Sequence, residues 1–184
     1  MPIQTPICDF GQKAHDFKLK STDNKIISLN DVKGENGTLI MFICNHCPYV
    51  KAVTKDIVED SKKLNDFGIN TVAICANDAE NYPEDSFENM ILFAKKHQFN
   101  FPYLVDETQE IAKTYDAVCT PDFFGYNKNL ELQYRGRLRE LKNLVPVREG
   151  ESDLFKAMKQ IADTGKGPEN QTPSAGCSIK WKNN

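Results

Sequence analysis

The sequence predicts an α/β domain in which a central mixed sheet is flanked by helices. Residues 39–44 form a continuous apolar run, as in a central strand that is buried on both faces, and residues 69–75 predict a second buried strand. Between them, residues 50–67 carry apolar side chains at helical spacing, and Gly68 ends the pattern. A strand, a helix and a strand in this order predict a right-handed crossover between parallel strands.

The elements on either side of this crossover follow from turn residues and periodicity. Residues 17–20 and 25–28 flank a polar turn at residues 21–24 and predict an N-terminal hairpin. A polar loop is expected at residues 76–85, at the same carboxyl edge of the sheet as the end of the first buried strand. Beyond it, apolar spacing predicts helices over residues 86–97, 107–115 and 152–163, and strands over residues 101–105, 123–126 and 130–135.

Composition indicates one domain in a reducing compartment. With 184 residues and 40% hydrophobic content, the chain can bury one core, so residues 1–163 are expected to form the domain and residues 164–184, rich in Gly, Pro and polar side chains, an extended tail. A net charge of −3 argues against nucleic acid and anionic membranes as partners. Without a signal-peptide pattern or a membrane-spanning apolar run, the protein is expected to be cytoplasmic, with its six cysteines reduced.

The junction between the first buried strand and its helix contains a cysteine with the features of a redox nucleophile. Pro48 is favoured at the first helical position, so Cys47 is expected at or beside the N-cap. Unpaired N–H groups and the helix dipole stabilise a thiolate at this position. A thiolate is the reactive form in thiol chemistry, so Cys47 is the expected nucleophile.

Two arrangements of the partner thiol are compatible with the sequence. Cys44 and Cys47 could form a redox CxxC pair, or Cys47 could pair with a residue from elsewhere in the fold. Three residues of extended chain span about 10 Å, beyond the roughly 7 Å between Cα atoms that a disulfide tolerates, unless Asn45 and His46 fold back. Pro48 fixes the helix start more firmly than anything in the sequence fixes that turn, so the second arrangement is preferred.

Two other interpretations compete with redox chemistry. Cys44 also fits a buried thiol that packs as a small hydrophobic side chain at the end of its strand. A structural zinc site normally needs four ligands, and the sequence has no second closely spaced Cys/His pair. Neither a metal nor a cofactor is therefore expected.

Four segments resemble a known family. They are Phe42-Ile-Cys-Asn-His-Cys-Pro-Tyr49, the loop from Asn77-Asp78 to Tyr82-Pro-Glu-Asp85, Cys119-Thr-Pro-Asp-Phe-Phe124 and Pro173-Ser-Ala-Gly-Cys-Ser-Ile-Lys-Trp181. The chain resembles redoxins of the alkyl hydroperoxide reductase/thiol-specific antioxidant (AhpC/TSA) family, in a peroxiredoxin-like subgroup. The resemblance implies a thioredoxin fold, a redox cysteine at Cys47 and a cis peptide bond before Pro121 that packs against this cysteine.

The sequence also departs from the patterns of related families. Thioredoxins carry a second cysteine where this chain has Val50, which puts exchange within the helix in doubt. Typical peroxiredoxins carry a threonine, which orients the peroxide, at the position of Cys44. Because a thiol is a weak hydrogen-bonding group, peroxidase activity is in doubt as well.

Several side chains are candidates to complete the site. Cys119 is expected on the loop that faces Cys47 and is the leading disulfide partner, ahead of Cys44. Cys177, on the tail, is another candidate for resolving a Cys47 intermediate. His46 is a candidate proton carrier. The guanidinium groups of Arg135 and Arg137 are further candidates, although arginines on strand surfaces more often have no such role.

These residues predict a thiol-dependent oxidoreductase in which Cys47 attacks a disulfide or a hydroperoxide. A thiol electron donor such as thioredoxin or glutathione is the expected partner, and a homodimer is compatible with the resemblance. The alternative is a non-catalytic binding module of thioredoxin fold in which the cysteines only pack.

Overall fold

A computed structural model describes residues 1–183. The helices of this part are α1 (Leu29–Val32), α2 (Pro48–Asn65), α3 (Phe87–Lys96), α4 (Glu110–Thr114) and α5 (Asp153–Thr164), together with the 3₁₀ turn η1 (Pro83–Asp85). The strands are β1 (Ile3–Gln4), β2 (Lys18–Ser21), β3 (Ile26–Ser28), β4 (Gly37–Phe42), β5 (Ile69–Cys75), β6 (Tyr103–Val105), β7 (Cys119–Thr120), β8 (Asp122–Asn127), β9 (Leu132–Tyr134), β10 (Leu141–Lys142), β11 (Val145–Pro146) and β12 (Ala175–Ser178).

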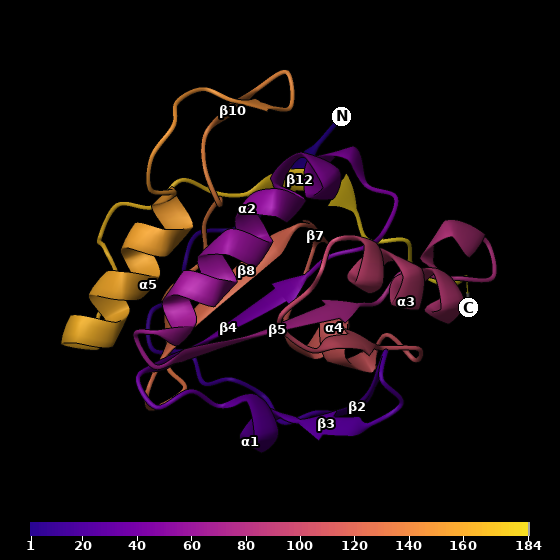
Figure 1. The fold of residues 1–184 in the computed structure, drawn as a ribbon, viewed down its shortest axis with the longest axis horizontal. Helices are drawn as coiled ribbons and strands as arrows, with labels where there is room; N and C mark the ends of the chain where they lie inside the picture. Colours follow the sequence, from indigo (N-terminus) through magenta and orange to yellow (C-terminus); the bar gives the residue numbers. More distant parts are fainter. Residues whose placement is uncertain (184) are drawn as a thin grey trace.

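A seven-stranded mixed sheet forms the centre of the fold, in the order β3-β2-β6-β5-β4-β8-β9 (Figure 1). Strands β4, β5 and β6 are parallel, and β2 and β8 run antiparallel to their neighbours in this group. This confirms the predicted α/β class with a mixed sheet. The carboxyl ends of β4 and β5 lie on the same edge, which is where α2 begins.

Two apolar layers hold the helices against the sheet. Successive residues of β4 alternate between them: Leu39 and Met41 pack in the layer that contains α2, α3 and α5, whereas Ile40 and Phe42 pack in the layer that contains α1 and α4. Every residue of β4 is buried. Burial on both faces explains the apolar run over residues 39–42 of this strand.

Helix α2 begins at the carboxyl edge of the sheet and packs against the core. Its start is set by Pro48 at the first helical position and by Cys47 as N-cap residue, as the sequence predicts. After its end the chain reaches Gly68, whose φ of 77° favours glycine. Between these ends, Val50, Val53, Ile57 and Leu64 face the core.

Some elements were not expected from the sequence. They include the short helix α1, the exposed β10–β11 hairpin and a three-stranded sheet in the order β1-β12-β7. This second sheet holds the C-terminal segment against the domain, so the predicted extended tail contains a strand. No helix in the described part of the chain combines the length and apolar character needed to span a bilayer.

Candidate active site

The Cys47 side chain lies at the N-cap of α2, opposite the loop that contains Pro121. Its sulfur is 3.3 Å from the backbone carbonyl oxygen of Thr120, to which a protonated thiol can donate. The peptide bond between Thr120 and Pro121 is cis, which confirms the expectation from the family resemblance. Cys47 has no exposed surface, so its chemistry is set by the surrounding protein groups.

The chain between Cys44 and Cys47 folds back, contrary to the extended path expected from the sequence. Strand β4 ends at Phe42, two residues earlier than predicted, and the backbone bends at Asn45 and His46. Hydrogen bonds hold this bend: Asn45 N donates to Asp85 Oδ1 at 2.7 Å, and the Tyr103 hydroxyl donates to Asn45 Oδ1 at 2.8 Å. The geometric objection to a CxxC pair therefore does not apply.

The bend brings Cys44 beside Cys47. The two side chains are hydrogen-bonded, and Cys44 Sγ also lies 3.5 Å from the Thr120 hydroxyl oxygen. Cys44 is 1% exposed, so both sulfurs are enclosed by protein. The Cys44 thiol is therefore in contact with Cys47, the expected nucleophile.

Hydrogen-bond donors around Cys47 favour its thiolate. The Cys44 thiol is the strongest of these and acts with the Cys177 thiol, the Thr120 hydroxyl and the Val50 N–H to lower the pKa of Cys47 to about 4, against the opposing effect of burial. The same hydrogen bond and burial raise the pKa of Cys44 well above its usual range. At neutral pH the pair therefore consists of one thiolate and one thiol.

Cys177 is the second thiol that contacts Cys47. It lies in β12, where it pairs with Thr120 of β7. Burial and the hydrogen bond to Cys47 raise the pKa of Cys177 to about 11. It therefore acts as a donor to the Cys47 thiolate in the reduced protein.

Cys119, the partner preferred from the sequence, is oriented differently. Its sulfur lies 3.6 Å from the carbonyl oxygen of Pro121, and burial raises its pKa well above the usual range. Pairing of Cys47 with Cys119 stays a prediction from the sequence, while the contacts favour Cys44 and Cys177.

His46 contacts a buried carboxylate, that of Asp85, which the sequence did not indicate as a site residue. Its Nδ1 lies 2.5 Å from Oδ2 of Asp85, whose side chain has no exposed surface. The donor atoms of Cys44, His46 and Asp85 lie within 4.8 Å of one another. Asp85 ends the loop that is predicted to lie at the same edge of the sheet as Cys47. This shared edge is the feature of the sequence that could have indicated Asp85 as a site residue.

These three side chains also form a group that could hold a metal ion. Two ligands at about 2.1 Å from a tetrahedral zinc ion lie about 3.4 Å apart, whereas the His46 and Asp85 atoms are 2.5 Å apart. Asp85 also accepts hydrogen bonds from Asn45 and Asn77. The arrangement favours a histidine–carboxylate contact beside Cys44 over a ligand set.

The arginines proposed from the sequence have other partners. Arg135 is buried and forms an ion pair with Asp122 at 3.0 Å, and its guanidinium group also lies over the ring of Phe124. Arg137 forms an ion pair with Asp153 at 2.7 Å. These contacts assign both guanidinium groups to holding the fold together.

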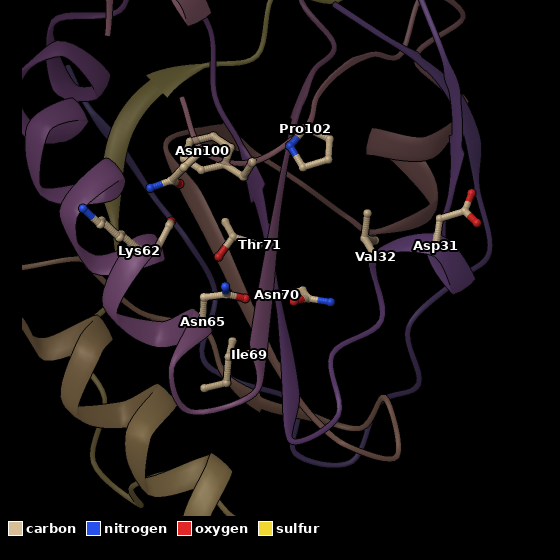
Figure 2. A pocket seen from close by; sticks show the side chains of 11 residues that line it. Asp31, Val32, Lys62, Asn65, Ile69, Asn70, Thr71, Asn100 and Pro102 are labelled. Atoms are coloured by element: carbon tan, nitrogen blue, oxygen red, sulfur yellow. The ribbon is translucent and has the colours of Figure 1, made fainter. Parts of the chain in front are cut away.

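Two pockets differ in their relation to the cysteines. A pocket of about 220 Å³ borders the site and is lined by Tyr49, Pro121 and Phe123, among others. Another, of about 280 Å³, is lined by Lys62, Asn65, Asn70 and other residues at the opposite ends of α2 and β5 (Figure 2). Only the first is close enough to receive a substrate of Cys47.

The thiolate of Cys47 can be tested by titration. In the reduced protein, the ultraviolet absorbance of a thiolate should be present at neutral pH and disappear as the pH falls through about 4. Because this pKa is below the value of about 8.5 for an unfolded cysteine, the thiolate stabilises the folded state. This contribution is complete above about pH 8.5 and is lost progressively as the pH falls to about 4.

The Cys47→Ser variant should lack the absorbance change, and Cys119→Ser should retain it. A midpoint close to that of free cysteine would contradict the hydrogen-bonding scheme around Cys47.

Comparisons with known proteins bear on the family and the fold. Residues 10–140 match the AhpC/TSA family. An uncharacterized conserved protein from Geobacillus kaustophilus has a TM-score of 0.92 and 42% sequence identity, over 99% of this chain and 97% of that chain. The thioredoxin domain of a thiol-disulfide oxidoreductase from Bacteroides vulgatus has a TM-score of 0.58 and 16% identity, over 73% of this chain and 89% of that chain. This likeness confirms the thioredoxin fold.

A curated relative also matches. The thiol-disulfide oxidoreductase ResA of Bacillus thuringiensis subsp. konkukian is 25% identical over 121 residues, which are 66% of this chain and 65% of ResA. The match thus spans just under two thirds of the length of that relative. Both the curated relative and the Bacteroides structure are described as thiol-disulfide oxidoreductases.

Proposed function

The chain belongs to the AhpC/TSA family, and we propose that it is a thiol-dependent oxidoreductase whose Cys47 thiolate attacks a disulfide sulfur or a hydroperoxide oxygen. The observation that carries this proposal is the contact between Cys47 and Cys44. It lowers the pKa of Cys47 to about 4 and keeps a second thiol in position to react next.

With a disulfide substrate the reaction has two exchange steps. The Cys47 thiolate attacks one substrate sulfur, which forms a mixed disulfide and releases the other substrate sulfur as a thiolate. Cys44 then loses its proton and attacks the Cys47 sulfur, which releases the second substrate thiol and leaves a Cys44–Cys47 disulfide. The substrate gains two electrons, and the cysteine pair loses them.

The proton on Cys44 needs an acceptor because its pKa is far above neutral. The His46–Asp85 pair lies within 4.8 Å of the Cys44 sulfur and is the nearest candidate base described by the geometry. His46 would take the proton and pass it to solvent, since its side chain is 27% exposed.

Access to Cys47 requires a local motion. The sulfur has no exposed surface, and β12 covers it through a pairing with β7 that involves Thr120 and Cys119. Short terminal segments open at a low free-energy cost compared with global unfolding. Separation of β12 from β7 would therefore admit a substrate from the pocket beside Tyr49 and Pro121.

A hydroperoxide would oxidise Cys47 to a sulfenic acid and release an alcohol or water. Cys44 would then condense with the sulfenic acid to give the same disulfide and a water molecule. In either case a thiol donor such as thioredoxin or glutathione would return the pair to the reduced state. We place this cycle in the cytoplasm, where free thiols persist; within residues 1–183 all six cysteines are unpaired.

A trapping experiment tests the proposed attack. The variant with both Cys44→Ser and Cys177→Ser lacks the two thiols that contact Cys47, so a mixed disulfide formed there cannot be resolved from within this site. We expect incubation with oxidised glutathione to add one glutathione, and peptide mapping to locate it on Cys47. The same variant with Cys47→Ser added is the control and should remain unmodified at residue 47.

The burial of Cys47 is the observation that favours the alternative, a binding module whose cysteines only pack. The same experiment separates the two functions. If Cys47 stays free of glutathione after prolonged incubation, the redox proposal fails and the binding module remains.

A further inference from the structure

The C-terminal segment is anchored on both sides of Cys177. Before this cysteine, Ser174 Oγ donates to the Pro121 carbonyl oxygen at 2.8 Å, and Ser174 N donates to Thr5 Oγ1 at 3.1 Å. After it, Lys180 N donates to Asn77 Oδ1 at 2.9 Å. Strand β12 thus lies beside the start of α2 (Figure 1), and the position of Cys177 is set by contacts with the domain.

Gly176 allows β12 to approach β7 this closely. A Cβ atom at this position would lie 2.0 Å from the Thr120 carbonyl oxygen, a distance too short for any side chain. Because Gly176 has no side chain, the next residue, Cys177, can pair closely with Thr120. The Cys47 sulfur contacts Thr120 as well, so Cys177 lies beside Cys47. Glycine at position 176 is what permits this close approach of the two backbones.

The thiols differ in their access to solvent. Cys44 is 1% exposed and Cys47 is fully buried, whereas Cys177 is half-buried. Cys177 also lines a surface pocket of about 410 Å³, together with Tyr49 and Lys180. Of these three cysteines, Cys177 is the one with exposed surface while β12 remains in place, so it is the one that we expect a molecule in solution to reach.

We propose that Cys177 is a third redox cysteine, which takes over the disulfide from Cys44 and presents it to an external thiol at the protein surface. This inference rests on the proposed function, because it needs Cys47 to become oxidised. It adds a route for the reducing half of the cycle that does not require β12 to open.

The exchange conserves atoms and electrons. In the oxidised protein, the Cys177 thiolate attacks the Cys47 sulfur, so the Cys47–Cys177 bond forms, the Cys44–Cys47 bond breaks, and Cys44 takes up the proton lost by Cys177. An external thiol such as glutathione then attacks the Cys177 sulfur and releases the Cys47 thiolate. A second external thiol releases Cys177, so that two external thiols become one disulfide and two protein thiols are restored.

The pKa values favour formation of the attacking Cys177 thiolate and the second step. Exchange is faster when the leaving thiol has a low pKa, and that of Cys47 is about 4, so the second step releases the best leaving group of the three. In the disulfide Cys47 carries no charge, and the hydrogen bond that helps to raise the pKa of Cys177 is absent. Lys180 and the N-terminal amine lower that pKa, which favours the attacking thiolate.

The Cys44→Ser variant tests the transfer. We expect oxidised glutathione to react at Cys47 and the resulting mixed disulfide to be resolved by Cys177, so that peptide mapping finds a Cys47–Cys177 disulfide. If the glutathione adduct persists on Cys47 as it does in the variant that also lacks Cys177, the relay is overturned while the proposed function stands. If Cys47 forms no adduct in either variant, the proposed function itself fails.

A kinetic comparison tests the route to the surface. Pre-oxidised Cys177→Ser protein should be reduced by glutathione more slowly than the oxidised wild type, by about tenfold or more, because the reductant must wait for β12 to open. Cys8→Ser is a matched control, since Cys8 is also half-buried and its pKa is also raised to about 11. Equal rates for wild type and Cys177→Ser would overturn the relay.

Discussion

Replacing Cys47 with serine is expected to lower the rate of disulfide exchange by at least about a thousandfold, because the nucleophile is removed. The hydroxyl of serine has nearly the size of a thiol but stays protonated at neutral pH. Serine is also a preferred N-cap residue, so α2 should keep its start. The measurements are turnover with a small disulfide and the thermal unfolding of the reduced protein.

Cys119→Ser is the control for this experiment, because Cys119 is equally buried but directed at Pro121. It should retain most of the activity. Wild-type turnover in Cys47→Ser, or loss of turnover in Cys119→Ser with an intact fold, would assign the chemistry to another cysteine.

The start of α2 illustrates what sequence reasoning can reach. Pro48 fixes the first helical turn locally, and the apolar runs on either side of the helix fix the two parallel strands. No distant residue is needed for these predictions. The position of Cys47 at a helix N-terminus on the carboxyl edge of the sheet was therefore predictable.

The bend at Asn45 illustrates what sequence reasoning cannot reach. The groups that hold it, Asp85 and Tyr103, are 40 and 58 residues away in the chain, and nothing in the local sequence specifies a turn. Without the bend, Cys44 is expected to continue the strand and Cys119 becomes the preferred partner. The choice of partner thiol thus depends on long-range hydrogen bonds that one sequence does not reveal.

The C-terminal strand was missed for a related reason. Residues 175–178 read Ala-Gly-Cys-Ser and have neither the apolar alternation nor the β-branched side chains typical of strands. Their pairing depends on backbone hydrogen bonds to β7 and β1 and on the close approach at Gly176. The sequence indicates Cys177 as a candidate only because it carries a thiol. Its contact with Cys47 becomes apparent only in the folded structure.

The reaction of Cys47 with hydrogen peroxide is expected to be slower by about two to three orders of magnitude than that of a site that orients the peroxide through hydrogen bonds. The low pKa does not compensate for this loss. At neutral pH Cys47 is fully ionised, so its thiolate fraction is about thirtyfold higher than that of an ordinary cysteine. The less basic thiolate is, however, about a hundredfold less nucleophilic, for a Brønsted coefficient of about 0.4 to 0.5. Speed with peroxide would therefore have to come from orientation.

The groups that face Cys47 provide little of that orientation. The position that is threonine in typical peroxiredoxins is Cys44, whose thiol is a weak donor and acceptor, and the Thr120 hydroxyl lies against this thiol at 3.5 Å. Larger substrates can gain apolar contacts in the pocket that contains Tyr49 and Phe123. Tyr82 stacks on the His46 ring, with centroids 6.1 Å apart.

Disulfides and bulky organic hydroperoxides should therefore oxidise Cys47 faster than hydrogen peroxide does, and stopped-flow measurement of Cys47 oxidation in the reduced protein decides this order. Cys44→Thr is the informative variant, because its hydroxyl can still donate to the Cys47 thiolate and can also bind a peroxide. Its rate with hydrogen peroxide should rise, although the later step that forms the Cys44–Cys47 disulfide is lost. A wild-type rate constant near those of efficient peroxidases, unchanged in Cys44→Thr, would show that orientation comes from groups other than residue 44.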